Sequence, residues 1–253
     1  DQEQKQINEK NIKIAYLPAS DLAQKAGGNA IMSNVVMVGA LWKHMNLPLE
    51  PLADVIRKEF ASKPDVIEPN LASLKSGYES ELEDLKKLNI NFSADAKRKD
   101  DALLTGNHLI SLGAAAAGVR AYFAYPMTPS SSILSYMAGI YHETGMLVKQ
   151  LDDEISVAQT VIGAMFMGTR ALVATSGGGF DLMTESVSLA AITETPFVCI
   201  LAQRPGPATG LPTWTSASDL NLAIYAGHGE FPRCVVALGD SASAYTVVQN
   251  AFN

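Results

Sequence analysis

The second part of this sequence, from about residue 103 onward, alternates short apolar runs with helical stretches. Five runs have the composition of buried strands: RAYFAY, MLVKQL, ALVATS, PFVCILAQ and CVVAL. Most of their starts fall about 25 residues apart, with a helical pattern in each gap. Strands that alternate with helices in this way predict right-handed crossovers and a parallel sheet with helices on both faces. The sequence therefore predicts an α/β fold.

Unusual side chains follow four of these predicted strands. Thr128 lies in PMTPSSS after the first run, Glu154 ends DDE after the second, Ser176 opens SGGGF after the third, and Arg204 opens RPGPATGLPT after the fourth. Ligands of parallel α/β sheets gather beyond the carboxyl ends of the strands. If the strands are neighbours, a hydroxyl, a carboxylate, a glycine-rich segment and a guanidinium meet at one edge of the sheet.

Each of these features also has a purely structural interpretation. Pro126 and Pro129 would end a strand and begin a helix, with Thr128 as the N-cap. The acids at 152–154 would complement the dipole of the helix EISVAQTVIGAMF. On the residues alone, both interpretations stay open.

The remaining segments at this edge are equally ambiguous. Gly177–Gly179 would form either a tight turn or a phosphate-binding helix start, although neither GxGxxG nor GK[ST] occurs in the chain. Arg204 would be a solvated loop residue. The four histidines share no metal-ligand spacing, and no metal site is predicted.

The first part of the chain has mainly helical patterns. Residues 29–46 are apolar almost all round and predict a buried helix, residues 52–60 predict a second helix behind Pro51, and residues 71–88 a third with a charged face. A polar, charged stretch then separates the two parts. We predict the boundaries 1–92 for the first domain, 93–104 for a linker and 105–253 for the second domain.

Charge and composition exclude several classes of protein. A net charge of −7 argues against a nucleic-acid surface, which needs clustered Lys and Arg. No apolar run is long enough for a membrane span, and the polar start DQEQKQINEK is unlike a signal peptide. Cys199 and Cys234 stand alone in apolar surroundings, which predicts small core residues of a reducing compartment. We therefore expect a cytoplasmic protein.

Several stretches in the second part resemble one known family. They are GNHLISLGAAAAGVRAYFAYPMTPSSSI, QLDDEISVAQTVIGAMFMG, ATSGGGFDLMTES, AQRPGPATGLPTWTSASDL and GHGEFPR. Together they resemble the pyrimidine-binding domain for thiamine diphosphate in the alpha subunit of the 2-oxoacid:ferredoxin oxidoreductases. Gly178 stands where the family commonly has proline.

The first part resembles the latter half of the gamma domain of the same enzymes, through SNVVMVGALWKHMNLPLEPLADVIRKEF and NLASLKSGYE. A gamma domain fused ahead of the alpha domain resembles the 2-oxoglutarate type. The resemblance lacks the glycine-rich opening of a gamma domain and the domain that follows in alpha subunits, so we expect this chain to be a fragment.

The resemblance implies roles for the residues at the strand ends. Glu154 would hydrogen-bond the aminopyrimidine ring of thiamine diphosphate, which makes it both catalytic and cofactor-binding. Thr128 would direct its hydroxyl to the substrate, and Arg204 would face the substrate carboxylate or coenzyme A. The remaining cofactor-binding residues implied by the family are Pro126, Ser176 and Gly177.

The implied activity is oxidative decarboxylation of a 2-oxoacid, 2-oxoglutarate by preference, to its acyl-coenzyme A, with ferredoxin as electron acceptor. Leu238-Gly239-Asp240-Ser241 lacks the second glycine of the family's diphosphate motif, and two cysteines are too few for an iron–sulfur cluster, which takes four. The resemblance therefore implies a beta subunit that supplies Mg²⁺, the diphosphate site and a [4Fe–4S] cluster, in a dimer of heterodimers. Alternatives are a pyruvate or branched-chain 2-oxoacid enzyme, a non-catalytic flavodoxin-like phosphate-binding module, and a structural subunit with a decayed site.

Overall fold

The computed structural model describes residues 10, 13–82, 88, 90 and 101–253. The chain divides into two compact units, residues 1–100 and 101–253. The first unit, within its described residues, is helical: α2 (Ala19–Lys25), η1 (Ala30–Met32), α3 (Ser33–His44), α4 (Glu50–Glu59), η2 (Pro64–Val66) and α5 (Ile67–Tyr78).

Two glycines bring α3 and α5 into backbone contact. A Cβ on Gly77 would overlap the carbonyl group of Val36, and a Cβ on Gly39 would overlap the carbonyl oxygen of Leu74. Leu74 itself is buried in a small core with Ala53 and Ile56 of α4. The first unit is therefore built around one close helix pair.

Two predictions for this unit were wrong in part. Residues 30–44 are helical, but α3 buries only Val36, Gly39 and Ala40, and its apolar residues Met37 and Leu41 are more than half exposed. The apolar composition is compatible with a helix, but it does not determine which faces of that helix other residues cover. The third helix ends at Tyr78 rather than near residue 88. The backbone N–H groups of Glu79 and Ser80 donate to carbonyls of its last turn, at Lys75 and Gly77. Residues 83–87 lie outside the described residues.

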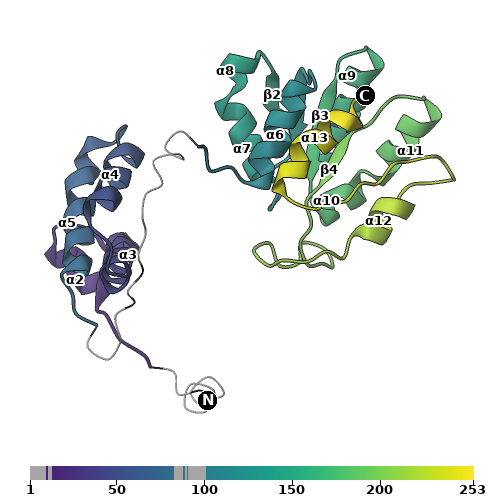
Figure 1. Ribbon diagram of the computed structural model, residues 1–253. Helices are drawn as coiled ribbons and strands as arrows, with labels where there is room; N and C mark the ends of the chain where they lie inside the picture. The colour runs from purple at the N-terminus through teal and green to yellow at the C-terminus, as the bar shows by residue number, and fades with distance from the viewer. Residues whose placement is uncertain (1–9, 11–12, 83–87, 89, 91–100) are drawn as a thin grey trace. The chain divides into compact units, whose positions relative to one another are not determined.

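The second unit is the predicted α/β domain (Figure 1). Its elements are α6 (Gly106–Ala116), β1 (Ala121–Ala124), α7 (Ser131–Gly139), α8 (Tyr141–Thr144), β2 (Leu147–Gln150), α9 (Glu154–Phe166), β3 (Ala171–Thr175), α10 (Gly177–Leu182), α11 (Thr184–Ile192), β4 (Cys199–Leu201), α12 (Leu220–Tyr225) and α13 (Ser241–Ala251). The four strands pair in the order β2-β1-β3-β4, and every pair is parallel. This confirms the predicted fold class.

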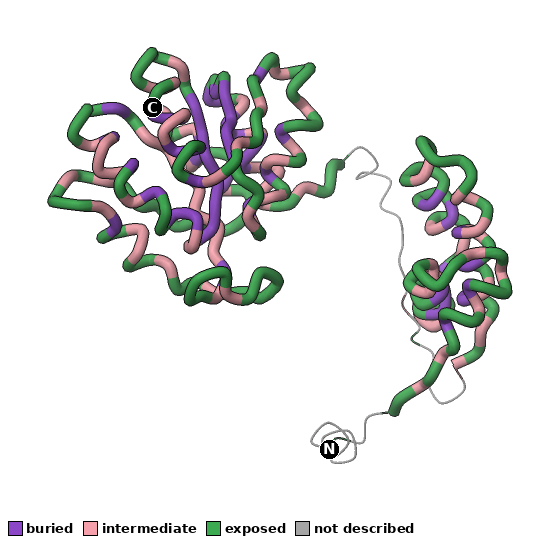
Figure 2. The backbone as a smooth tube through the Cα atoms, turned by 180° about the vertical axis from the view of Figure 1, so that it is seen from behind, coloured by how far each residue is buried: buried purple, intermediate pink, exposed green. Residues whose placement is uncertain are grey.

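Helices cover both faces of the sheet, because successive side chains of β1 point to opposite sides. Tyr122 and Ala124 pack in a core with residues of α6, α7 and α13. Ala121 and Phe123 pack in a second core with residues of α9. Figure 2 shows the buried strands enclosed between these layers. Every residue of β1 and β3 is buried.

Three details of the predicted core were wrong. CVVAL is not a strand: Val235, Val236 and Leu238 are exposed, and no described strand pairs with them. Apolar composition alone does not provide a neighbouring strand to pair with. The strand β2 lies at an edge of the sheet and is largely exposed rather than buried. Cys234, the first residue of CVVAL, is exposed for the same reason, whereas burial raises the pKa of the Cys199 thiol in β4 to about 12.

Candidate active site

The strand order determines where a ligand can enter this domain. The strand β2 lies on one side of β1, whereas β3 and β4 lie on the other, so the direction of winding reverses between β1 and β3. Crevices at such reversals, outside the carboxyl ends of the strands, are the usual ligand sites of open α/β sheets. Thr128 follows β1 and Ser176 follows β3, while Glu154 and Arg204 follow the two outer strands. The structure therefore brings all four predicted segments to the same edge of the sheet.

The loop after β1 is fastened from two sides. The side-chain amide of Asn107 in α6 donates to the carbonyl of Pro129 at 3.0 Å and to the hydroxyl of Ser132 at 2.6 Å. Within the loop, the Ser130 hydroxyl donates to the carbonyl of Met127 at 2.6 Å. The two prolines and Ser130 thus belong to a loop that side-chain hydrogen bonds hold in place, and Ser131 and Ser132 begin the helix that follows it.

Arg204 provides a third attachment. Its Nη1 donates to the main-chain carbonyl of Thr128 at 2.6 Å, and the residue is only 7% exposed. It forms no ion pair with a described carboxylate, and this single hydrogen bond leaves most of its five N–H donors available. The interpretation of Arg204 as a solvated loop residue is therefore wrong.

Thr128 and Pro126 are both exposed at this loop. The helix α7 begins at Ser131, and its N-cap position is Ser130. Thr128 is therefore not the N-cap of that helix, and its hydroxyl forms no hydrogen bond with the described residues.

Glu154 is the first residue of α9 and is 4% exposed. Its Oε1 atom is buried and accepts no hydrogen bond from any described group. A buried carboxylate without a donor is costly, and native proteins keep such groups mainly where function requires them. Helix capping does not account for Glu154, because its neighbour Asp153 performs that task.

Asp153 occupies the N-cap of α9. Its two carboxylate oxygens accept from the backbone N–H and the hydroxyl of Ser156, each at 2.8 Å. The backbone hydrogen bond from Ser156, followed by the hydroxyl one, lowers the pKa of Asp153. The helix-start interpretation is thus confirmed for Asp153; Asp152 lies outside the helix and is exposed.

Each of the three glycines after Ser176 packs against a different part of this chain. A Cβ on Gly177 would stand 2.6 Å from Oδ2 of Asp219, and one on Gly178 would stand 3.2 Å from the carbonyl oxygen of Ala208. A Cβ on Gly179 would overlap Oγ1 of Thr175 and stand 2.8 Å from Oε1 of Glu154. A carboxylate beside Gly177 argues against a phosphate site there, because the two anions repel each other.

Unpartnered polar atoms concentrate around this glycine segment. Among the described residues, four buried side-chain polar atoms lack a hydrogen-bond partner, and three of them belong to Glu154, Ser176 and Asp219. Ser176 is completely buried and does not cap α10 through its side chain. Sequence reasoning missed Asp219 and Thr175, since nothing in the pattern indicates which residues pack against glycine.

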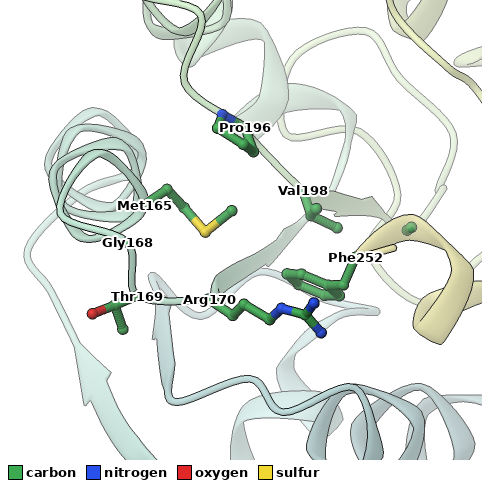
Figure 3. A pocket seen from close by; sticks show the side chains of 8 residues that line it. Met165, Gly168, Thr169, Arg170, Pro196, Val198 and Phe252 are labelled. Atoms are coloured by element: carbon green, nitrogen blue, oxygen red, sulfur yellow. The ribbon is translucent and has the colours of Figure 1, made fainter.

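A pocket of the described chain lies elsewhere. It has a volume of about 230 Å³ and is lined by residues that precede β3 and β4, by the end of α9 and by the end of α13 (Figure 3). Arg170 and Val198 lie just before the first residues of β3 and β4, so this pocket is at the amino ends of the strands. It does not include the carboxyl-end site.

Among the residues that the structure describes, no group of three or more His, Cys, Asp or Glu side chains lies together as a metal ion would need. In the same part of the chain, none of the helices is both long and apolar enough to cross a membrane.

Comparison with known proteins shows the family to which this chain is similar. Residues 112–253 match the family described as pyruvate flavodoxin/ferredoxin oxidoreductase, thiamine-diphosphate-binding, and residues 2–80 match the family described as pyruvate ferredoxin/flavodoxin oxidoreductase. The chain is 36% identical over 228 residues to subunit alpha of 2-oxoacid:ferredoxin oxidoreductase 1 from Aeropyrum pernix, which covers 86% of this chain and 35% of that one. It is 40% identical over 156 residues to the 2-oxoglutarate synthase subunit KorA of Methanothermobacter thermautotrophicus, covering 61% of this chain and 41% of that protein.

A solved structure shows the same fold. The 2-oxoglutarate:ferredoxin oxidoreductase of Magnetococcus marinus, determined with 2-oxoglutarate, coenzyme A and succinyl-CoA bound, superimposes with a TM-score of 0.74 at 32% identity. The match covers 94% of this chain and 41% of that one. The chain thus spans about two fifths or less of the length of these relatives. Because the thiamine-diphosphate-binding domain matches more than half of the chain, the protein belongs to the pyruvate flavodoxin/ferredoxin oxidoreductase family, as a relative of the alpha subunits of 2-oxoacid:ferredoxin oxidoreductases.

Proposed function

We propose that this chain is part of a thiamine-diphosphate-dependent 2-oxoacid:ferredoxin oxidoreductase and provides the aminopyrimidine half of its active site. The observation that carries the proposal is the buried, unpartnered Oε1 of Glu154 at the carboxyl edge of the sheet. Membership in a family with a thiamine-diphosphate-binding domain names the group that would satisfy it.

The residues present fit that cofactor. The carboxylate of Glu154 lacks a hydrogen-bond donor, and the ring nitrogen of a bound aminopyrimidine would supply one when protonated. Gly179 has only hydrogen atoms on Cα, so it leaves space beside the carboxylate that a Cβ would fill. Ser176, Gly177 and Pro126 are the further residues we propose along the cofactor. When bound, thiamine diphosphate supplies the nucleophilic carbon and the electron sink that decarboxylation of a 2-oxoacid requires.

Glu154 would hold and release a proton at the ring nitrogen and so control the basicity of the neighbouring amino group. Because Oε1 of Glu154 is buried, water does not compete for it, and the carboxylate is available to accept a hydrogen bond from the ring nitrogen.

Thr128 and Arg204 would address the substrate. The exposed side chain of Thr128 lies on a loop that hydrogen bonds fix in place, so its hydroxyl loses little freedom when it meets a substrate oxygen. Arg204 is buried and uses one of its donors on the Thr128 carbonyl. Its remaining donors suit a carboxylate, whether that of the 2-oxoacid or an acidic group of coenzyme A.

The substrate that we favour is 2-oxoglutarate, with succinyl-coenzyme A as product. Support comes from the relatives named 2-oxoglutarate synthase and from the structural relative determined with 2-oxoglutarate and succinyl-CoA. Pyruvate and branched-chain 2-oxoacids share the keto and carboxylate groups that Thr128 and Arg204 would contact, and they remain the alternatives to test.

The other parts of the reaction would come from a beta subunit. We propose that it binds Mg²⁺ and the diphosphate and carries a [4Fe–4S] cluster, since these 253 residues contain two cysteines and a cluster takes four. Ferredoxin and coenzyme A complete the set of partners, and the assembly would be a cytoplasmic dimer of heterodimers. In it, residues 1–92 would belong to a gamma-like domain, 93–104 to a linker and 105–253 to the pyrimidine-binding domain.

The test is to purify the complex from its native cells through a tag on this chain. The complex is assayed for reduction of ferredoxin and for acyl-coenzyme A formation with 2-oxoglutarate, pyruvate and 2-oxoisovalerate. We expect activity that requires thiamine diphosphate and coenzyme A and is highest with 2-oxoglutarate. A purified complex without activity on any 2-oxoacid would contradict the proposal, and preference for another 2-oxoacid would contradict only the substrate.

A further inference from the structure

The segment between β4 and α12 forms a loop whose two ends are joined. Residues 204–218 leave the end of β4 and return at Asp219, where the backbone N–H of Asp219 donates to Oε1 of Gln203 at 2.9 Å. Compact loops with adjoining ends are frequent carriers of function. We use the name 204–218 loop for this segment.

The inner side of the 204–218 loop rests on the glycines at the start of α10. The carboxylate of Asp219 lies so close to Gly177 that a Cβ there would stand 2.6 Å from Oδ2 and 3.0 Å from Cγ. The carbonyl oxygen of Ala208 lies against Gly178 in the same way, at 3.2 Å from the position of a Cβ. Because Gly177 and Gly178 have no side chains, the loop packs directly against the backbone at the start of α10.

The loop also has an internal turn. The backbone N–H of Leu211 donates to the carbonyl of Pro205 at 3.0 Å. Gly210 has a φ of +59°. It lies so close to the same carbonyl that a Cβ at this position would overlap the carbonyl oxygen. Beyond this turn the loop carries Trp214, which is 67% exposed.

Arg204 is the first residue of the loop and the neighbour of Gln203. Its guanidinium reaches across to the Thr128 carbonyl, so its position depends on where the loop begins and how firmly that start is held. We propose that Gln203 and Asp219 are positioning residues: they clamp the two ends of the 204–218 loop on Gly177 and thereby keep Arg204 directed at the site. This inference rests on the proposed function only for its effect on substrate binding.

Such a clamp has a chemical consequence for specificity. Donors that bind a substrate carboxylate must be held in place before the substrate arrives, because ordering them on binding reduces affinity. Loosening the clamp should therefore weaken substrate binding, with a smaller effect on the turnover of bound substrate.

Trp214 offers a direct measurement of the loop. The chain has two tryptophans, and Trp42 lies in α3 of the other unit. In the full chain with Trp42→Phe, the anisotropy decay of Trp214 reports nanosecond motion of the loop alone. The test variant is Gln203→Met, which keeps the length of the side chain and removes the acceptor for Asp219.

Two glycine variants complete the design. Gly177→Ala displaces the Asp219 carboxylate, whereas Gly163→Ala places a methyl group where nothing lies within 4 Å and serves as the matched control. We expect at least a twofold larger fast-depolarising fraction in Gln203→Met and Gly177→Ala, and no change in Gly163→Ala. Circular dichroism spectra that match the parent confirm that the fold is retained; if Gly177→Ala fails to fold, Gln203→Met alone decides.

An unchanged anisotropy decay in Gln203→Met overturns the clamp. The same variant in the purified complex separates this inference from the proposed function. A faster loop with a KM for the 2-oxoacid raised several-fold and kcat nearly unchanged supports both. A faster loop with unchanged KM supports the clamp and contradicts the role of Arg204 in binding the substrate.

Discussion

Gly179 faces the carboxylate of Glu154 so closely that a Cβ at this position would stand 2.8 Å from Oε1. The two residues come from different helices, α10 and α9, and meet at the carboxyl edge of the sheet. The glycine therefore determines how much space lies beside the one buried carboxylate that the proposed chemistry needs.

Replacing Glu154 by Gln tests that chemistry directly. The amide keeps the size of the side chain but does not take a proton from the aminopyrimidine ring. In the purified complex we expect the exchange of the C2 proton of bound thiamine diphosphate for deuterium to slow by at least about 100-fold. Complex assembly should be unchanged. Exchange at the wild-type rate would show that Glu154 does not perform this role.

The space beside Glu154 can be tested with Gly179→Ala. The added methyl group would overlap Thr175 and press on Glu154, so we expect a loss of about 1–3 kcal/mol of stability through overpacking. Gly163→Ala in α9 is the control, because its methyl group enters open space and alanine favours helix by roughly 0.5–1 kcal/mol. Differential scanning calorimetry of the full chain should show shifts of opposite sign for the two variants. Equal shifts would mean that the contact at Gly179 has no energetic weight.

Arg204→Lys tests the carboxylate-binding role. Lysine keeps the charge but replaces a planar fork of donors by a single ammonium group. We expect a higher KM for the 2-oxoacid or for coenzyme A, by about tenfold, with a smaller change in kcat. Steady-state kinetics of the complex with each substrate varied in turn distinguishes the two ligands. If neither KM changes, the hydrogen bond to Thr128 is the whole function of Arg204.

Asp153→Ala removes the N-cap of α9, on which the placement of Glu154 depends. The pKa of Asp153 is lowered in the folded chain by the hydrogen bonds from Ser156. Its stabilising contribution is therefore complete above the unfolded pKa, near the ordinary value of 3.8, and is lost as the pH falls through the lower folded pKa. Thermal melts should show a lower melting temperature for Asp153→Ala than for Asp152→Ala at pH 7, with the gap closing in strong acid. A gap that persists unchanged below pH 3 would exclude the ionised cap as its cause.

The isolated chain should bind thiamine diphosphate weakly. The proposed site offers the aminopyrimidine a carboxylate but places the diphosphate and Mg²⁺ in a partner, and these charged groups would account for most of the affinity. Calorimetric titration with thiamine diphosphate and Mg²⁺ should give a dissociation constant well above the micromolar range. Micromolar binding by the chain alone would contradict a site shared between subunits.

The positions of the site residues were predictable because strand ends were predictable. Alternating apolar runs gave β1 to β4 their places, and a parallel sheet brings the residues after its strands to one edge. The contacts of Gly177 and Gly178 were not predictable, since they depend on how a long loop returns to the sheet. CVVAL shows where the sequence pattern fails. Its apolar residues satisfy the pattern for a strand, but a strand also needs a neighbouring strand with which to pair. Composition does not indicate whether such a neighbour is available.

The parallel sheet also has a consequence for how such a protein can diverge. Each of the segments that carry Thr128, Glu154, Ser176 and Arg204 follows a strand of its own, and the hydrogen bonds between the strands do not involve their side chains. A gene can therefore accumulate substitutions, insertions or deletions in the 204–218 loop while the register of β1 to β4 is inherited unchanged. If the proposed function holds, substrate range and decarboxylation chemistry would be separate heritable traits of one fold, and the first could change while the second is kept.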